Sequence, residues 1–322
     1  MKLITVHEQE EGQKLLKLLG SYLKEASGGF LHKMLRKKNI TLNGKKADGK
    51  EKLCQGDEIC FFFSDETYEK FAGKQLTAKE QFPTAKLDIL YEDSHVLLVN
   101  KPAGMLTQKA AYKDVSLNEY VLGYLSKSGQ WSPEEKAFRP SVCNRQDRKT
   151  RGLVICGKSM IGLQRMAELL QDRSLHKYYL CLIHGAMKEG QRLEGWLRKD
   201  EKSNQVEILK APVEDAAQII TEYEPMKVSS EATLLKVKLV TGKPHQIRAH
   251  LASVGHPIIG DPKYGDVQIN EYYRKEFKLN RQLLHAWRLE FPELAAPLTD
   301  LSQKVVEAPV PELMNKIMQK VM

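Results

Sequence analysis

One carboxylate stands among four cations near the middle of the chain. It is Asp147, and the cations around it are Arg145, Arg148, Lys149 and Arg151. Nearby positive charge favours the ionised form of a carboxyl group, and a nucleophile needs that form whereas a general acid does not. The segment therefore indicates a nucleophilic aspartate just before the apolar, strand-like run 153–156. The alternative interpretation is a surface turn whose aspartate is neutralised by its neighbours.

A second polar cluster lies about a hundred residues later. The run TGKPHQIRAHL (241–251) leads into GHPIIGDPKYG (255–265), and its glycines and prolines bracket a short helix. Arg248 on that helix is a suitable partner for a distant carboxylate, because a guanidinium grips both oxygens in one plane. The alternative is a routine salt bridge. His245, His250 and His256 do not share one helical face and no cysteine accompanies them, so we expect no metal site.

Other catalytic signatures are missing from the sequence. It contains no GxGxxG after a strand, no GxxxxGK[ST], no HExxH and no GxSxG.

The 50 Lys and Arg exceed the 41 Asp and Glu, giving a net charge of +9, which favours an acidic partner. No run approaches 18 apolar residues, and the start MKLITVHEQEEG turns acidic before any apolar run. We expect a cytoplasmic protein that contacts no membrane.

The elements that must position these residues follow no regular βαβ alternation. Apolar periodicity predicts strands at 87–91, 96–100, 153–156, 178–183, 233–239 and 286–291. Helices are predicted at 116–127, 159–172 and 245–254, with a short amphipathic helix at 311–322. This order favours an α+β fold with a central mixed, largely antiparallel sheet and flanking helices over a Rossmann sheet.

The first 64 residues have a different texture. Helices are predicted at 11–26 and 30–38, strands at 39–42 and 58–63, and a tight turn at Asn43-Gly44. Eight Lys or Arg against two acids lie between Leu31 and Leu53. The stretch resembles the S-four-type RNA-binding domain, a small α/β unit, and a solvated basic face is the alternative. The resemblance implies phosphate contacts by Lys33, Arg36, Lys37, Lys38, Lys45 and Lys46.

Several segments between about 88 and 292 together resemble one enzyme family. They are NKPAG (100–104), the Asp147 run NRQDRKTRGL (144–153), KYYLCLIHG (177–185), the two runs around Arg248, and LHAWRL (284–289). In this order they resemble an RluA-type RNA pseudouridine synthase. The resemblance implies the family's pseudouridine synthase fold, a sheet with a cleft, and neither cofactor nor metal.

The same resemblance implies roles for individual residues. Asp147 would attack the target uridine so that the base detaches, rotates and rejoins through carbon 5. Tyr179 would pack on the uracil and is a candidate base, and Arg248 would pair with Asp147. The remaining implied roles are those of Arg145, which fills the space left by the flipped uridine, and of Leu153 and Ile247 in the uracil pocket. We also expect Arg148 and Arg151 to bind RNA. The chain departs from the family pattern at Asn144, Gln146, Arg151, Lys243 and Pro244.

We therefore predict an RNA-binding domain at 1–64, a linker at 65–84, a catalytic domain at 85–298 and a helical tail at 299–322. The predicted function is isomerisation of specific uridines to pseudouridine in ribosomal RNA, or in transfer RNA, by a monomeric enzyme. The alternative is a non-catalytic RNA-binding or ribosome-assembly protein on the same fold. A hydrolase acting on free uridine derivatives is a third interpretation, which the basic amino-terminal segment disfavours because a small substrate needs no such surface.

Overall fold

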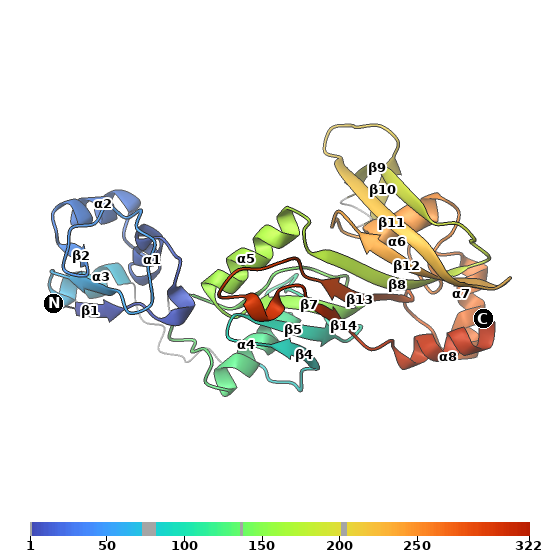
Figure 1. Cartoon of the computed structure of the whole chain (residues 1–322), viewed down its shortest axis with the longest axis horizontal. Coiled ribbons are helices and arrows are strands. Elements are labelled where there is room, and N and C mark those ends of the chain that lie inside the picture. Colours follow the sequence, from blue (N-terminus) through green and yellow to red (C-terminus); the bar gives the residue numbers. More distant parts are fainter. Residues whose placement is uncertain (1, 73–81, 136–137, 201–204) are drawn as a thin grey trace.

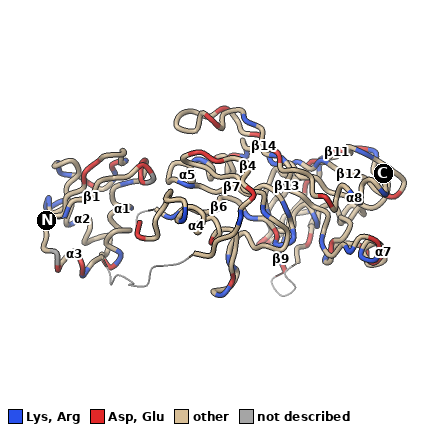
Figure 2. Tube along the Cα trace, turned by 90° about the horizontal axis from the view of Figure 1, so that it is seen from below, with Lys and Arg blue, Asp and Glu red and all other residues tan. Residues whose placement is uncertain are grey.

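The computed structural model describes residues 2–72, 82–135, 138–200 and 205–322. Its amino-terminal unit contains β1 (Lys2–Thr5), the 3₁₀ turn η1 (Glu8–Glu10), α1 (Leu15–Tyr22), α2 (Gly28–Arg36), β2 (Ile40–Leu42), β3 (Glu58–Phe61) and α3 (Asp65–Ala72). The three strands form one antiparallel sheet in the order β1-β3-β2. Leucines of α1 and α2 pack with Ile59 and Phe61 of β3 in a separate core. Both views place this unit at one end of the molecule (Figures 1 and 2).

The turn after β2 forms where the sequence predicts it. Asn43 and Gly44 have φ angles of +50° and +71°, a conformation that asparagine and glycine adopt more readily than other residues. The Asn43 side chain also accepts a hydrogen bond from the Glu58 main-chain N–H and donates one to Asp57. The turn is therefore fixed to the start of β3.

The predicted linker at 65–84 is wrong for its first eight residues, which form α3. Tyr68 on this helix is buried, and its ring lies 5.3 Å from that of Phe61. Packing against the amino-terminal core stabilises a helix whose own sequence carries no sustained apolar period. Residues 73–81 of the predicted linker lie outside the part of the chain that the structure describes.

The rest of the chain is built on one large sheet. Its main path runs β10-β9-β11-β12-β8-β13-β7-β5-β4, with β14 added to β13 and β6 to β7. The strands are β4 (Ile89–Glu92), β5 (Val96–Lys101), β6 (Ser141–Val142), β7 (Arg151–Gly157), β8 (His176–His184), β9 (Gln191–Asp200), β10 (Gln205–Leu209), β11 (Ala217–Val228), β12 (Ala232–Leu239), β13 (Leu284–Glu290) and β14 (Val305–Glu307). Only the β13–β7 pair among these described strands is parallel, so the predicted mixed, largely antiparallel α+β fold is confirmed.

Five helices of the described ranges accompany this sheet: α4 (Leu117–Lys127), α5 (Met160–Gln171), α6 (Gln246–Ser253), α7 (Val267–Phe277) and α8 (Glu312–Val321). The predicted helices at 116–127, 159–172, 245–254 and 311–322 match α4, α5, α6 and α8 within two residues. The predicted tail at 299–322 is not separate, however. It supplies β14 to the sheet, and Met314, Ile317 and Val321 of α8 are buried in the core.

Charged residues are spread over the whole molecule. Figure 2 shows Lys and Arg on both the amino-terminal unit and the large sheet, interspersed with Asp and Glu. In the described ranges, none of the helices combines the length and the apolar character that a membrane span requires.

Candidate functional site

Asp147 lies in a loop that is fastened to a neighbouring loop just before β7. The Thr107 hydroxyl donates to the main-chain oxygen of Gln146 and accepts from its N–H, both at 3.1 Å. One residue beyond Asp147, Arg148 Nε donates to the Gly104 oxygen at 2.9 Å, and the Gly104 N–H donates to the Arg148 oxygen at 2.8 Å. Hydrogen bonds to the main chain of this loop therefore hold the residues on both sides of Asp147 in place.

A buried lysine lies beneath this pair of loops. Lys101, at the end of β5, has no exposed surface, and its Nζ donates to the main-chain oxygens of Thr150 at 2.6 Å and Met105 at 3.0 Å. Burial lowers the pKa of Lys101 to about 8, while the Asp147 carboxylate acts in the opposite direction. The ammonium thus joins the loop after β5 to the loop that carries Asp147.

Arg248 connects Asp147 to a second, fully buried carboxylate. Its Nη1 donates to Asp147 Oδ2 at 2.8 Å, while Nε and Nη2 donate to Asp261 Oδ2 and Oδ1 at 2.6 and 2.8 Å. The side chains of Arg248, Asp147 and Asp261 are 5%, 22% and 0% exposed. Asp261 thus fixes the guanidinium plane from behind, and Arg248 presents its remaining nitrogen to the accessible carboxylate.

The charges within this triad stabilise one another. Burial by itself lowers the pKa of Arg248, but its bonds to Asp261 and Asp147 raise that pKa above its ordinary value. Burial likewise acts to raise the pKa of Asp261, yet the Arg248 guanidinium holds it below its usual range. Arg248 and Asp261 are therefore both charged at neutral pH.

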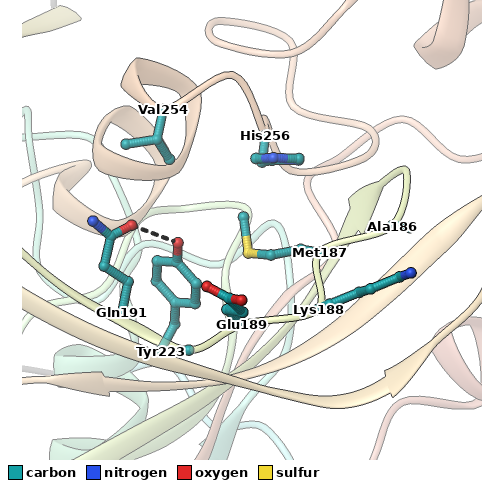
Figure 3. Close-up of a pocket in the computed structure, with 9 residues that line it drawn as sticks. Ala186, Met187, Lys188, Glu189, Gln191, Tyr223, Val254 and His256 are labelled. Atoms are coloured by element: carbon teal, nitrogen blue, oxygen red, sulfur yellow. Dashed lines mark hydrogen bonds between the residues drawn. The ribbon is translucent and has the colours of Figure 1, made fainter.

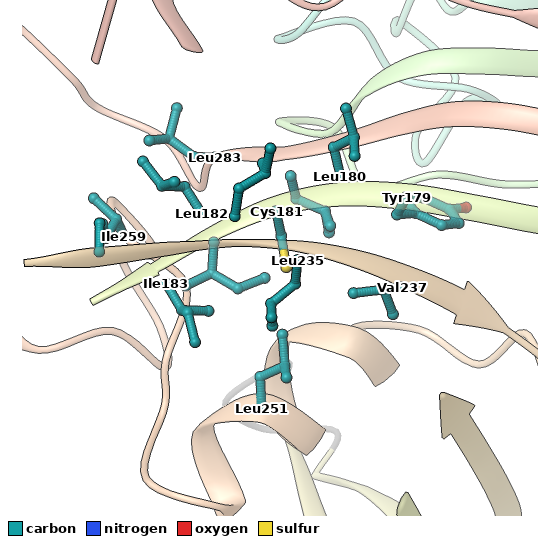
Figure 4. Close-up of a cluster of buried hydrophobic side chains, with 14 of the residues drawn as sticks. Tyr179, Leu180, Cys181, Leu182, Ile183, Leu235, Val237, Leu251, Ile259 and Leu283 are labelled. Carbon is teal, nitrogen blue, oxygen red and sulfur yellow. The ribbon is translucent and has the colours of Figure 1, made fainter. Parts of the chain in front are cut away.

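Tyr179 lies on β8 between the two strands that flank it, opposite Val237 of β12 and Ala286 of β13. It is buried at the end of an apolar cluster, away from the leucines around Leu182 (Figure 4). Burial, and then the negative charge of Asp147, raise the pKa of Tyr179 well above its ordinary value. The phenol is therefore protonated at neutral pH, so it acts as a base only after its own proton has moved.

The two predicted pocket residues fall in different clusters. Ile247 is buried in the cluster that contains Tyr179. Leu153 is buried on β7 with Leu98 and Ile155, in a separate cluster. The main-chain oxygen of Leu153 accepts a hydrogen bond from the Gln146 side-chain amide, in the loop that carries Asp147. The structure groups Ile247 with Tyr179 and does not group Leu153 with them.

The predicted RNA-binding cations are mostly exposed. Arg145 and Arg148 are exposed beside Asp147, whereas Arg151 is half-buried and its Nε has no partner among the described residues. All six basic residues of the amino-terminal unit, Lys33, Arg36, Lys37, Lys38, Lys45 and Lys46, are exposed. Lys33 and Arg36 of α2 line one groove of about 380 Å³ together with Lys46.

Comparison with known proteins identifies the catalytic region. Residues 95–253 match the family model described as RNA pseudouridylate synthase. Residues 95–253 therefore belong to this family. The chain is 29% identical over 334 residues to ribosomal large subunit pseudouridine synthase C of Escherichia coli K12, covering 99% of this chain and 96% of that protein. It is 27% identical over 324 residues to the enzyme of the same name from Vibrio vulnificus, with the same coverage.

A solved structure agrees with the family assignment at the level of the fold. Human RNA pseudouridylate synthase domain containing 4 superposes with a TM-score of 0.56 at 21% identity, covering 72% of this chain and 92% of that one. The predicted pseudouridine synthase fold is confirmed, and so is the predicted enzyme class, a pseudouridine synthase, which is an isomerase.

Three residues near Asp147 received no role from the sequence. Asp261 and Tyr264 lie in the quoted run GDPKYG, and His245 precedes α6. His245 Nε2 lies 3.9 Å from Asp147 Oδ2, and its Nδ1 lies 2.9 Å from the Tyr264 hydroxyl. The sequence could have drawn attention to Asp261, because an aspartate between glycine and proline is unusual in a buried segment. It could not have shown that Arg248, 13 residues earlier, is its partner, because tertiary structure alone brings the two together.

A cavity of about 640 Å³ lies elsewhere, between the turn that joins β8 to β9 and the end of α6 (Figure 3). Tyr223 donates to the Gln191 side chain at its wall, and Met187 and His256 also line it. None of the residues around Asp147 lines this cavity.

In the described part of the chain, no group of three or more His, Cys, Asp or Glu is arranged to hold a metal ion.

Proposed function

We propose that this chain isomerises specific uridines of large-subunit ribosomal RNA to pseudouridine, with Asp147 as the nucleophile. The observation that carries the proposal is the Asp147–Arg248–Asp261 triad, in which a partly exposed carboxylate meets a guanidinium fixed by a buried one. Arg248 and Asp261 are almost entirely buried, so Asp147 is the member of the triad that a substrate would reach most readily. The curated relatives named ribosomal large subunit pseudouridine synthase support ribosomal RNA over transfer RNA as the substrate.

Each side chain has a physical task in this reaction. A uridine in a helix must leave its stack, at a cost of roughly a few kcal/mol, before a carboxylate can reach it. The exposed Arg145 enters the space that the uridine leaves. Tyr179 and Ile247 provide the buried apolar surface on which the uracil packs. Asp147 then attacks, the base detaches and rotates, and it rejoins through carbon 5.

The amino-terminal unit serves as an S-four-type RNA-binding domain in this proposal. Its exposed cations, with Lys33, Arg36 and Lys46 around one groove, contact phosphates and position the RNA without reading its sequence. Residues 1–72 form this domain, because α3 completes its core, and residues 82–322 form the catalytic domain. We expect the enzyme to act as a monomer in the cytoplasm and away from membranes.

Asp147→Asn separates an enzyme from a non-catalytic RNA-binding protein on the same fold. Asparagine is nearly isosteric, and Asp261 still pairs with Arg248, so the site should keep its shape. The amide is a far poorer nucleophile than a carboxylate. We expect no pseudouridine from the variant, with RNA binding retained.

Total RNA from cells that lack the gene is the substrate for this test, since it contains the target in unmodified form. Mapping of pseudouridines after incubation with each protein gives the site as well as the activity. If neither wild type nor variant forms pseudouridine while both bind, the binding-protein alternative is correct. If the variant converts uridine at the wild-type rate, Asp147 is not the nucleophile.

A further inference from the structure

His245 is held beside the nucleophile by an unusual backbone conformation. It precedes α6 with φ +55°, in the left-handed region, which costs a residue with a side chain about 1–2 kcal/mol. The buried Gln246 side chain fixes this bend, since its oxygen accepts from Thr241 Oγ1 and the Lys243 N–H, and its nitrogen donates to the Ile220 oxygen. A strained conformation that the surroundings enforce this firmly points to a use for the side chain.

Hydrogen bonds around Tyr264 determine which imidazole nitrogen carries the proton. The Tyr264 hydroxyl accepts from the Val206 N–H at 2.8 Å and lies 2.9 Å from His245 Nδ1. Among the described residues, Nδ1 is the acceptor within reach of the hydroxyl proton. Tyr264 thus donates to Nδ1, and the proton of a neutral imidazole must sit on Nε2. That Nε2–H is the atom that lies 3.9 Å from Asp147 Oδ2.

Burial favours the neutral form of this imidazole. It lowers the pKa of His245, and Arg248 and Lys263 act in the same direction, against the opposing charges of Asp147 and Asp261. The side chain is still 12% exposed, so a substrate bound over Asp147 can reach Nε2. The distance of 3.9 Å to Asp147 is too long for a direct hydrogen bond, so the donor remains available to a third group.

We propose that His245 is a further catalytic residue, whose Nε2–H donates a hydrogen bond to a carbonyl oxygen of the detached uracil. The inference rests on the proposed function. When the glycosidic carbon–nitrogen bond breaks, its electron pair stays on the uracil, and the charge spreads over N1 and the two carbonyl oxygens. Carbon 5 of this anion then bonds to the sugar carbon, while the bond between that carbon and Asp147 breaks and its electron pair returns to the carboxylate. One proton leaves carbon 5 and another joins N1. A fixed donor stabilises the anion between these two steps.

His245→Asn is the first test. Asparagine tolerates the left-handed conformation, and its short amide occupies the place of Nδ1 but does not reach that of Nε2. We expect the single-turnover rate on unmodified large-subunit ribosomal RNA transcript to fall about 100- to 1000-fold, as for one lost oxyanion-hole donor. RNA affinity should stay within about threefold, because the interaction forms only during the reaction. His245→Gln extends an N–H to the Nε2 position and should recover at least tenfold of the loss.

His250→Asn is the matched control. His250 lies on α6 and is buried, and its Nδ1, like that of His245, lies 2.9 Å from a hydroxyl, here that of Thr221. Among the described contacts, no hydrogen bond or ion pair joins His250 to Asp147. Its variant should retain the wild-type rate at temperatures where it is folded. Tyr264→Phe removes the donor that keeps the proton of the neutral imidazole on Nε2, so the single-turnover rate should fall while RNA affinity stays within about threefold. In the His245→Asn background the same change should have a smaller effect, because no imidazole remains to be oriented.

The outcomes distinguish this inference from the proposed function. A wild-type protein that forms no pseudouridine in any RNA refutes the proposed function itself. With an active wild type, a His245→Asn rate within threefold of normal, or equal rates for the Asn and Gln variants, overturns the role of His245. Equal effects of Tyr264→Phe in the wild type and in the His245→Asn background overturn the assigned tautomer.

Discussion

Replacing Asp261 with asparagine tests whether Arg248 depends on the buried carboxylate behind it. Asp261 Oδ1 accepts from Arg248 Nη2 and from the Lys263 and Tyr264 N–H groups, whereas Oδ2 accepts only from Arg248 Nε among the described residues. An asparagine that keeps the three bonds of Oδ1 must place its NH₂ group where Oδ2 stood. Two donors, the amide and Arg248 Nε, would then face each other in a site with no exposed surface.

The expected destabilisation follows from these contacts. The substitution removes one charge-assisted bond, worth about 1.5–3 kcal/mol, and leaves a buried donor without an acceptor. Loss of one partner from a buried ion pair typically destabilises by about 3–5 kcal/mol. Because Asp147 remains as a counter-ion and Oδ1 keeps its bonds, we expect the lower end, about 3 kcal/mol. The reaction rate should fall as well, since Arg248 is no longer fixed when it meets Asp147.

Tryptophan fluorescence during urea unfolding measures this change in the right part of the chain. The three tryptophans, Trp131, Trp196 and Trp287, all lie outside the amino-terminal unit, so their signal follows the large sheet alone. Asp266→Asn is the control: Asp266 caps the exposed start of α7, and asparagine caps helices about as well as aspartate, so its effect should stay within about 0.5 kcal/mol. A loss below about 1 kcal/mol for Asp261→Asn would refute the reasoning that Asp261 holds Arg248.

Three further predictions concern other parts of the molecule. Tyr179→Phe keeps the ring but removes the hydroxyl, so turnover should fall by roughly 10²-fold with RNA affinity within a few-fold of wild type; near-normal turnover would exclude a role for the hydroxyl. Burial lowers the pKa of His250 to about 4, whereas in the unfolded chain this histidine binds a proton below about pH 6.5. Between pH 6.5 and 4 the wild type should therefore lose about 2–3 kcal/mol more stability than His250→Asn. Parallel curves of stability against pH for the two proteins would contradict this. Replacing Lys33, Arg36 and Lys46 with glutamine should flatten the log–log salt dependence of RNA affinity by roughly 0.7–0.9 for each lost phosphate contact, and an unchanged slope would mean that these residues are only solvated.

The elements that could be predicted from the sequence are those with a helical apolar spacing, such as α4 and α5, or with a continuous apolar run, such as β5, β8 and β12. The glycines and prolines on either side of α6 indicated that helix. β9 and β11 show neither pattern: Gly195 occupies an inward position between Leu193 and Leu197, and the register of β11 shifts between Pro225 and Lys227. Both irregularities hide the alternation that marks a strand.

The site was predictable in part for a similar reason. The resemblance placed Asp147, Tyr179 and Arg248 in one site. In the structure Arg248 donates to Asp147, and the charge of Asp147 acts on Tyr179. The resemblance could not reveal Asp261, because a carboxylate 13 residues from Arg248 becomes its partner only through the turn that follows α6. Nor could it show that Leu153 faces a different cluster from Tyr179, since strand periodicity does not say which face of a sheet lines the site.

The order of strands in the large sheet has a consequence for synthesis of the chain. Among the described strands, β13 lies between β8 and β7 and is the element that joins the two halves of the sheet (Figure 1). It is formed by residues 284–290, so a growing chain cannot connect the half that carries Asp147 with the half that carries Tyr179 and Arg248 until these residues have been made. Long-range pairings of this kind form late and slowly, whereas the amino-terminal unit can fold first from local contacts. A nascent enzyme would thus hold a folded amino-terminal unit well before its reactive groups are assembled.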